Sequence, residues 1–298
     1  MTSILLAGTI GSQLDAIFAD FDYAVFSFMG SIQDQFLTLI AKCLTALGST
    51  IFVSLIAVVG LVFLIFKRTR KVGLALVIAI VIGTLITNII VKPMFLRVRP
   101  YNTLQSDLQY WSWYVGAGML SESDYCFPSG HTTGATEIAM VLLLCHATSK
   151  RKSAKAFCWL FPLVAIGVGA SRVYLMVHYT TDVLAGFLVG IIAGVIGFLV
   201  SSLILKGWSS NEDIQRLMKT NVRPAGIIAI ILAFCLIYSF SLIHVFKSGG
   251  ADALRCAYDI EYACQNEAAT GHKYPPINGE YYCKLHWSEM NQLELTGN

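Results

Sequence analysis

Three short stretches of the chain contain the residue types needed for phosphate chemistry. One reads Pro-Ser-Gly-His and ends on His131, and another contains Ser-Arg followed by His178 and Asp182. The third begins with Lys92 and ends with Arg99 and a proline. A phosphate dianion needs cations and hydrogen-bond donors around its oxygens, and these stretches supply both. The candidate phosphate-binding residues are Lys92, Arg99, Ser129, Gly130 and Arg172.

Two histidines suffice for a two-step displacement at phosphorus. One attacks the phosphorus, and the other protonates the leaving oxygen and later activates water. Asp182 lies four residues after His178, close enough in a turn or helix to hold one ring nitrogen and aim the other. Gly130 lets the backbone approach the phosphate closely, and a helix beginning there would direct its amides at the anion. The three stretches therefore predict a phosphoryl-transfer site.

In this order, and each beside an apolar segment, the motifs resemble those of the type 2 phosphatidic acid phosphatase superfamily, from about Ile51 to Leu205. The resemblance implies that His178 is the nucleophile and forms a phosphohistidine. It implies that Asp182 orients His178 and that His131 is the general acid. It also assigns transition-state stabilisation to Lys92, Arg99, Ser129, Gly130 and Arg172. The alternative is three unrelated motifs whose basic residues only anchor helices at the interface.

The composition predicts a membrane protein. The chain is 56% hydrophobic and 13% charged, with a mean hydropathy of +0.65, which excludes an ordinary soluble domain. We expect an all-α fold, a polytopic membrane helix bundle of six spans plus an N-terminal interfacial amphipathic helix. The six apolar segments are Ile51–Phe66, Val72–Val91, His131–Cys145, Ala156–Val177, Asp182–Leu205 and Ala225–Val245.

The segment Tyr23–Leu47 is apolar but interrupted by polar residues, Asp34 and Lys42 among them. Its apolar residues recur at helical spacing, which favours an amphipathic helix in the interface over a seventh span. The predicted organisation is an interfacial segment at 1–49 and a phosphatase core of five spans at 50–207. A cytoplasmic loop with the sixth span follows at 208–246, and a non-cytoplasmic, cysteine-containing tail at 247–298.

Basic residues predict the orientation. The segments 67–71, 150–155 and 206–223 each contain four lysines and arginines, so the positive-inside rule makes them cytoplasmic. The three motifs lie at the opposite ends of the spans. The active site is therefore expected on the non-cytoplasmic side of the cell membrane. The net charge of +3 follows from these loops and does not indicate nucleic-acid binding.

Other residues near the motifs leave alternatives open. Glu137 lies two turns deeper than Gly130 and either accepts a hydrogen bond below the phosphate or pairs with another span. The aromatic residues between the first two motifs are expected at the membrane boundary, as a lip for the lipid or as plain anchors. They are Tyr101, Tyr110, Trp111, Trp113 and Tyr114.

Four cysteines are predicted on the non-cytoplasmic side, where they could form two disulfides. They are Cys126, Cys256, Cys264 and Cys283. His272 and His286 lie among the last three, but their spacing matches no common zinc-finger pattern. We therefore predict no metal in the tail.

The motifs and the composition together predict a membrane enzyme that hydrolyses a lipid phosphate or diphosphate at the outer face. No Asp/Glu constellation typical of a two-metal phosphatase lies beside the motifs, so we expect no metal or other cofactor. The resemblance implies phosphatidate, phosphatidylglycerol phosphate or undecaprenyl diphosphate as substrate, with a slight preference for the last. The alternatives are a lipid phosphotransferase using the same histidine and a non-catalytic lipid-binding or transport protein. The expected partners are the lipid substrate and the bilayer.

Overall fold

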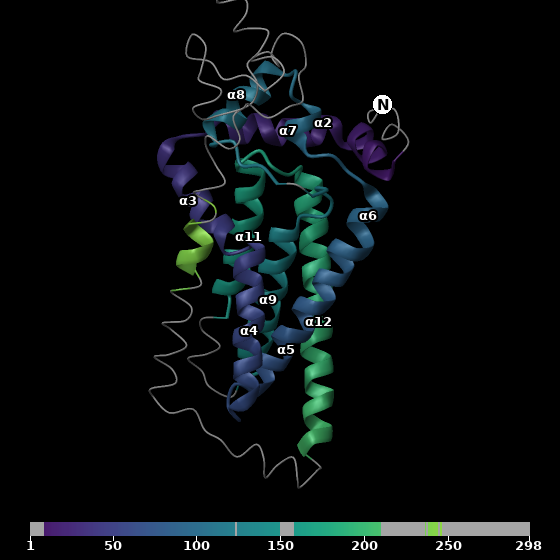
Figure 1. Cartoon of the computed structure of the whole chain (residues 1–298), viewed down its shortest axis with the longest axis vertical. Helices are drawn as coiled ribbons and strands as arrows, with labels where there is room; N and C mark the ends of the chain where they lie inside the picture. Colours follow the sequence, from purple (N-terminus) through teal and green to yellow (C-terminus); the bar gives the residue numbers. More distant parts are fainter. Residues whose placement is uncertain are drawn as a thin grey trace, which may run out of the picture.

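A computed structural model describes residues 9–122, 124–149, 158–209, 236, 238–243 and 245. Helices are the regular structure of these residues, which contain no strand. Five helices run side by side in a bundle (Figure 1): α4 (Thr50–Ile65), α5 (Arg70–Thr84), α9 (Gly130–Ala147), α11 (Leu160–Tyr174) and α12 (Thr180–Ser209). The all-α helix bundle predicted from the sequence is confirmed.

Two helical units in the described residues are long and apolar enough to cross a membrane. They are Arg70–Thr103 and Thr180–Gly207. Helix α3 (Gln35–Ala46) meets α4 at a bend of 41°. If these two helices count as one bent span, they form a third such unit. The predicted number of six spans therefore stays a prediction. Most of its last span, Ala225–Val245, lies outside the described residues.

The N-terminal region differs from the single interfacial helix expected over Tyr23–Leu47. Helix α2 (Ile10–Ser31) ends within that segment, and α3 begins after a short turn. Asp34 causes the break, because its carboxylate caps α3 by accepting from the amides of Phe36 and Leu37 at 2.7 and 3.0 Å. Helix α2 lies across one end of the bundle, whereas α3 turns towards α4 (Figure 1). The crossing helix therefore begins and ends earlier than predicted.

Helix α12 holds the bundle together by packing against both α9 and α5. Glycine on the face of α12 that contacts α9 lets the two helices lie close together. A Cβ on Gly190 would lie 2.6 Å from Cβ of Thr136 and 2.8 Å from the carbonyl oxygen of Thr133. Small residues that let helix backbones approach are typical of membrane bundles. This packing fixes α9, which begins at the second motif, against α12, which begins at the third.

The first motif lies where the α5 helix changes form. After Thr84 the chain continues as a π-helix, η1 (Leu85–Val91), then as α6 (Lys92–Phe95). The loop 96–99 leads to α7 (Pro100–Thr103) and then to α8 (Leu108–Gly116), which lies above the bundle beside α2 (Figure 1). The π-helical turn brings Lys92 to the same end of the bundle as the start of α9.

Several predictions from the sequence concern residues that the structure does not describe. The tail 247–298 and its three cysteines, including the zinc alternative, lie outside the described residues, as do most of the basic loops at 150–155 and 206–223. The basic segment 67–71 joins α4 and α5 at the end of the bundle opposite α2 (Figure 1).

Candidate active site

All predicted site residues lie at the end of the bundle that α2 crosses. Lys92 begins α6, Arg99 caps α7, and Arg172 lies in the last turn of α11. His178 lies in the turn between α11 and α12, and Asp182 in the first turn of α12. Ser129, Gly130 and His131 form the N-terminus of α9. The fold brings the three motifs together, as the sequence predicted.

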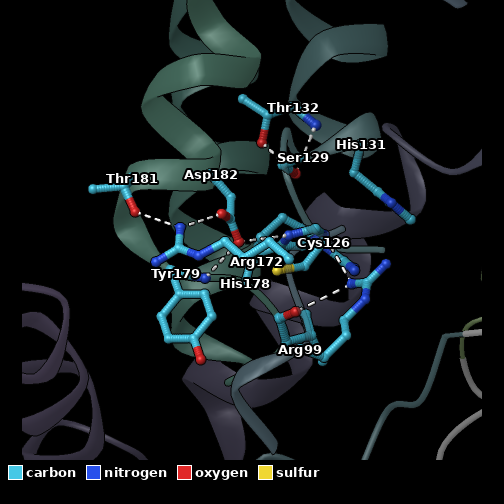
Figure 2. Close-up of polar contacts among 12 residues, drawn as sticks. Arg99, Cys126, Ser129, His131, Thr132, Arg172, His178, Tyr179, Thr181 and Asp182 are labelled. Carbon is cyan, nitrogen blue, oxygen red and sulfur yellow. Dashed lines mark hydrogen bonds and ion pairs between the residues drawn. The ribbon is translucent and has the colours of Figure 1, made fainter. Parts of the chain in front are cut away.

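His178 and Asp182 form a buried pair. The Nδ1 atom of His178 lies 3.3 Å from Oδ2 of Asp182, and the backbone amide of Tyr179 donates to the same oxygen at 3.0 Å (Figure 2). The two side chains are 1% and 0% exposed. This contact places the proton on Nδ1, which leaves Nε2 with a lone pair on the opposite side of the ring. The Nε2 atom lies 2.9 Å from Nη1 of Arg99.

The side chains of all three motifs converge on the carboxylate of Glu122. One oxygen, Oε1, pairs with Nη2 of Arg172 and lies 3.7 Å from Nδ1 of His131. The other, Oε2, lies 2.6 Å from Nη2 of Arg99 and 4.0 Å from Nε2 of His178. Two arginines and two histidines thus surround a single anionic group. An anion that presents oxygens both to Arg172 and His131 and to Arg99 and His178 would fit the position of this carboxylate.

The charges around Glu122 stabilise a carboxylate. Burial opposes its ionisation, but the positive charges of Arg172 and Arg99 outweigh burial and hold the pKa of Glu122 well below its usual range. The same arginines disfavour the charged form of His178, because that form is a cation. Burial first, and then the charges of Arg99 and Arg172, hold the pKa of the His178 imidazole well below its usual range. Both effects favour the neutral imidazole of His178, which is the form that can act as a nucleophile.

A cavity of about 1080 Å³ opens beside these residues and is lined by Lys92, Glu122, Gly130, His131 and Arg172 among others. His178 and Arg99 do not line it and are almost fully buried. Since Glu122 both lines the cavity and contacts Arg99, its carboxylate lies between the cavity and His178. The Glu122 carboxylate thus separates His178 from the cavity in this structure.

Lys92 and the N-terminus of α9 form the cationic wall of the cavity. The Lys92 ammonium pairs with Asp124 and is near Gly130, where a Cβ would lie only 3.7 Å from Nζ. Ser129 is placed differently from the prediction. Its Oγ accepts hydrogen bonds from the amide and hydroxyl of Thr132 at 3.4 and 3.0 Å, and the residue does not line the cavity. The Ser129 hydroxyl therefore caps α9 in this structure (Figure 2).

Arg97 is a site residue that the sequence analysis missed. Its Nη1 atom donates to Oδ1 of Asp182 at 2.5 Å, and its Nη2 atom donates to Oδ2 of Asp22 at 3.1 Å. Asp22 lies in α2 and also accepts from the amide and hydroxyl of Thr181 at 3.1 and 2.9 Å. Asp15 binds Nε of Arg97 at 2.7 Å. Helix α2 thereby fixes the carboxylate that holds His178.

Glu122, Asp124 and Asp22 were also missed. Glu122 and Asp124 lie six and four residues before the proline of the Pro-Ser-Gly-His motif, and their acidic character near a predicted anion site was the available signal. Asp15 and Asp22 are seven residues apart, which places them on one face of a helix, and this shared face was the available signal. Arg97 lies inside the first motif, two residues before Arg99.

Three residues near the site have backbone conformations that residues other than glycine rarely adopt. Leu96, Met119 and Met176 have φ values of 52°, 46° and 57°. Leu96 directly precedes Arg97, and Met176 is fully buried two residues before His178. Such strain persists only where the surrounding contacts determine the backbone, and it concentrates at functional sites.

The aromatic residues between the first two motifs support the site from within the fold. Tyr110 is fully buried, and its hydroxyl donates to the carbonyl oxygen of Met176 at 2.5 Å. The hydroxyl of Tyr101 donates to the carbonyl of Glu122 and accepts from its amide. Tyr114 donates to the carbonyl of Leu120 at 2.8 Å. These three tyrosines hold the loops that carry Glu122 and His178, and Tyr101 and Tyr114 also line the cavity, so their place at the membrane boundary stays a prediction.

Cys126 also differs from its expected role. It is a free, buried thiol whose Sγ donates to the carbonyl of Val98 at 3.2 Å, so it takes no part in a disulfide here. Its sulfur, a nitrogen of His178 and an oxygen of Asp182 lie within 4.8 Å of one another, a spacing that a metal ion could use. A metal needs the thiolate, but burial and the carboxylate of Asp182 raise the pKa of Cys126 well above its usual range. Arg97 already neutralises Asp182, so these residues fit a metal poorly.

Comparison with known proteins places the chain in a family. The model of the PAP2 superfamily matches residues 70–206. An undecaprenyl-diphosphatase of Sulfolobus acidocaldarius is 37% identical over 131 residues, which are 43% of this chain and 54% of that protein. Phosphatidylglycerophosphatase B of Bacillus subtilis is 31% identical over 166 residues, which are 54% of this chain and 73% of that protein.

A solved structure agrees with these matches. The crystal structure of a transmembrane PAP2 type phosphatidylglycerolphosphate phosphatase from Bacillus subtilis is 26% identical to this chain, with a TM-score of 0.52. The superposition covers 65% of this chain and 92% of the other. By its helices, the placement of its three motifs and these matches, the chain is a membrane protein of the PAP2 superfamily.

Proposed function

We propose that the protein hydrolyses a lipid phosphate through a phosphohistidine on His178. The observation that carries this proposal is the convergence of Arg99, Arg172, His131 and His178 on the Glu122 carboxylate. Carboxylate and phosphate groups both present two oxygens that can accept parallel hydrogen bonds from one arginine guanidinium. When the phosphate of a substrate replaces this carboxylate, it lies between the two histidines.

The first step uses the two histidines on opposite sides of the phosphate. His178 Nε2 attacks phosphorus, while Asp182 holds the proton on Nδ1 and compensates the charge that develops on the ring. The bond from phosphorus to the lipid oxygen breaks, and His131 donates a proton to that oxygen. His131 suits this role because it lines the cavity, from which the leaving group extends. The negative charge of the bound phosphate favours the protonated form of His131, so the proton to be donated is taken up together with the substrate. The products are the lipid alcohol and a phosphohistidine.

The second step reverses the role of His131. Now neutral, it accepts a proton from a water molecule, whose oxygen attacks phosphorus. The phosphorus–nitrogen bond breaks and inorganic phosphate leaves, which restores neutral His178 and protonated His131. In both steps Arg99, Arg172 and Lys92 compensate the charge on the equatorial oxygens, and the amides at the start of α9 add neutral donors.

The proposed reaction uses no metal. Arg99 and Arg172 contact the anion position and Lys92 lines the cavity beside it, so these cations supply the charge that divalent ions supply in two-metal phosphatases. A divalent cation would be repelled by the same residues. Activity should therefore persist in EDTA.

The substrate is proposed to be a lipid at the non-cytoplasmic face. The site lies at the end of the bundle opposite the basic segment 67–71, consistent with the positive-inside rule. Helix α2 crosses this end and exposes large apolar side chains: Ile17 is 72%, Phe28 60% and Phe21 46% exposed. An amphipathic helix of this kind lies in the interface, at the level of lipid head groups. The related proteins act, by their names, on undecaprenyl diphosphate and on phosphatidylglycerol phosphate.

The test is phosphate release by the purified full-length protein from a panel of lipid phosphates in detergent micelles. We expect release in EDTA, inhibition by vanadate and loss of release in His178→Ala. Release that requires added magnesium would contradict the mechanism. Appearance of the phosphate on a second lipid instead of in solution would identify a phosphotransferase.

A further inference from the structure

The cavity beside the phosphate site continues into the membrane part of the bundle. Its lining includes His131 and Arg172 at one end and Thr84, Asn88 and Glu137 farther along α5, η1 and α9. The mechanism proposed above uses only the first group. The polar residues of the second group, here called the Glu137 subsite (Thr84, Asn88 and Glu137), therefore need a separate explanation.

Glu137 is a buried acid whose hydrogen bonds are incomplete. The residue is 1% exposed, and its Oε2 atom has no hydrogen-bond partner among the described residues. The carboxyl group lies against Gly83 of α5, where a Cβ would come within 1.7 Å of Oε2. A glycine here leaves the space that the carboxyl occupies. Burying a polar group without a partner is costly, and in a membrane span such a group indicates a function or a ligand.

Thr84 and Asn88 add polar groups to an otherwise apolar span. Both are exposed, although they belong to the unit Arg70–Thr103 that is long and apolar enough to cross a membrane. They lie where α5 passes into the π-helix η1, a rare conformation found frequently at functional sites. An exposed amide and hydroxyl facing lipid chains would be unfavourable, so their place on the cavity wall indicates polar contents.

The position of Glu137 fixes where a ligand group would lie. Glu137 follows His131 by six residues, about 9 Å along the helix axis. Side chains in a helix slant towards its N-terminus, which brings the carboxyl closer to the phosphate site than its Cα. The group that contacts Glu137 must therefore be only a few bonds from the phosphorus.

We propose that the Glu137 subsite binds a hydroxyl group of the lipid substrate, a few bonds from the phosphate that is removed. A hydroxyl both donates and accepts, so it can pair with the carboxyl group, the amide and the threonine hydroxyl together. A carboxyl group that is buried without an ionic partner stays protonated, with one O–H donor and one acceptor oxygen. An ester carbonyl or a phosphate oxygen can only accept, so it would leave the acceptor oxygen of Glu137 without a partner. The inference rests on the proposed function and specifies its substrate class: phosphate esters of hydroxyl-bearing lipids, in preference to polyprenyl diphosphates.

A matched pair of substrates tests this proposal. The probes are phosphatidylglycerol phosphate and an analogue that lacks only the hydroxyl on its head-group glycerol. We expect the wild-type protein to favour the hydroxylated lipid by about tenfold in kcat/KM, the effect of one hydrogen bond at the upper end of the usual range. In Glu137→Leu, kcat/KM for the hydroxylated lipid should fall about tenfold, whereas the value for the analogue stays within about twofold.

Two further variants separate recognition from folding. Glu137→Gln keeps the shape of the side chain and should retain part of the preference, which guards against a folding defect in the leucine variant. Val141→Ala is the matched control, because Val141 is fully buried in the same helix but does not line the cavity. It should lower the melting temperature and leave the preference intact.

The outcomes are distinct. Equal losses for both lipids in Glu137→Leu and Glu137→Gln, or no preference in the wild type, would overturn the subsite while leaving the phosphatase proposal in place. Release of phosphate from neither lipid, nor from any other lipid phosphate, would overturn the proposed function and the subsite with it.

Discussion

Buried ionisable groups lie on both sides of the phosphate site, but their hydrogen bonds are satisfied to different degrees. On the side of α2, Arg97 is fully buried and donates to Asp15, Asp22 and Asp182. On the side of the cavity, Glu137 has an oxygen without a partner in the described residues. A completed network fixes geometry, whereas an incomplete one leaves capacity for a ligand. We infer that the first side positions the nucleophile and that the second recognises the substrate.

Glu122 lies between the two sides and belongs to neither. Its carboxylate is paired by the arginines of the site, yet it must leave that position when a phosphate binds. The loop that carries it is held at its backbone by Tyr101, so a movement of the side chain alone can open the path to His178. Each of the three regions therefore predicts a different kinetic effect.

The largest loss of activity is expected from a change on the side of α2, where the buried network positions His178. Asp182→Asn removes the charge that Arg97 and His178 share, so kcat should fall by about 10³–10⁴-fold with little change in KM, as for the orienting carboxylate of other histidine sites. Steady-state kinetics with a soluble short-chain lipid phosphate measure both constants. A rise in KM without a fall in kcat would place Asp182 in binding and contradict its positioning role.

A smaller loss is expected from Arg97→Lys. A lysine keeps the positive charge but cannot reach Asp15, Asp22 and Asp182 with one planar group, so we expect kcat to fall about 10²-fold. The phosphate contacts remain, so vanadate should inhibit the variant at the same concentration as the wild type. Asp15→Asn is the matched control, because Asp15 lies at the more exposed edge of the network, and its effect should be within about threefold. Weaker vanadate inhibition in Arg97→Lys would show that Arg97 binds the substrate.

The fold and the central residues could be predicted from the sequence because they depend on local patterns. His178 and Asp182 are four residues apart, and Lys92 to Arg99 form one motif, so short-range geometry brings their side chains together. The contact between Arg97 and Asp22 joins residues 75 positions apart and depends on the path of α2 across the bundle. No local pattern indicates that path.

The end of α2 could not be predicted from the sequence for a different reason. Apolar residues continue at helical spacing through residues 29–47, and that periodicity concealed the cap at Asp34. A capping residue at one position outweighed the periodicity because it satisfies two amides of the next helix. Ser129 was expected only as a phosphate contact, but its hydroxyl also caps α9, a contact that the motif itself does not indicate.

Glu122→Gln tests the region between the two sides. The amide lacks the charge that pairs with Arg99 and Arg172, so an incoming anion competes with a weaker group. We expect vanadate to bind about tenfold more tightly, measured by the shift of the melting temperature with vanadate concentration. An unchanged or weaker affinity would mean that Glu122 helps to hold the anion rather than to replace it.

The smallest effect concerns the pH profile. Neutral His178 is the reactive form, so kcat/KM should fall as pH drops through its pKa, which burial and then the charge of Arg99 lower. Removing that charge in Arg99→Gln raises the pKa, and the acid limb should move to higher pH by about one unit or less. Arg99→Lys keeps the charge and should leave the limb near its wild-type position. Ionisation of the substrate affects all three proteins equally, so a common limb would assign it to the substrate rather than to His178.

Trapping the phosphohistidine tests the central proposal most directly. His131→Ala should still react with a labelled phosphate ester whose leaving group needs no proton, but water activation is slowed, so the covalent intermediate accumulates. Rapid quenching of this variant should give label that is lost in acid and stable in base, and peptide mapping should place it on His178. Label that persists when His178→Ala is added to this variant, or that maps to another residue, would contradict the account.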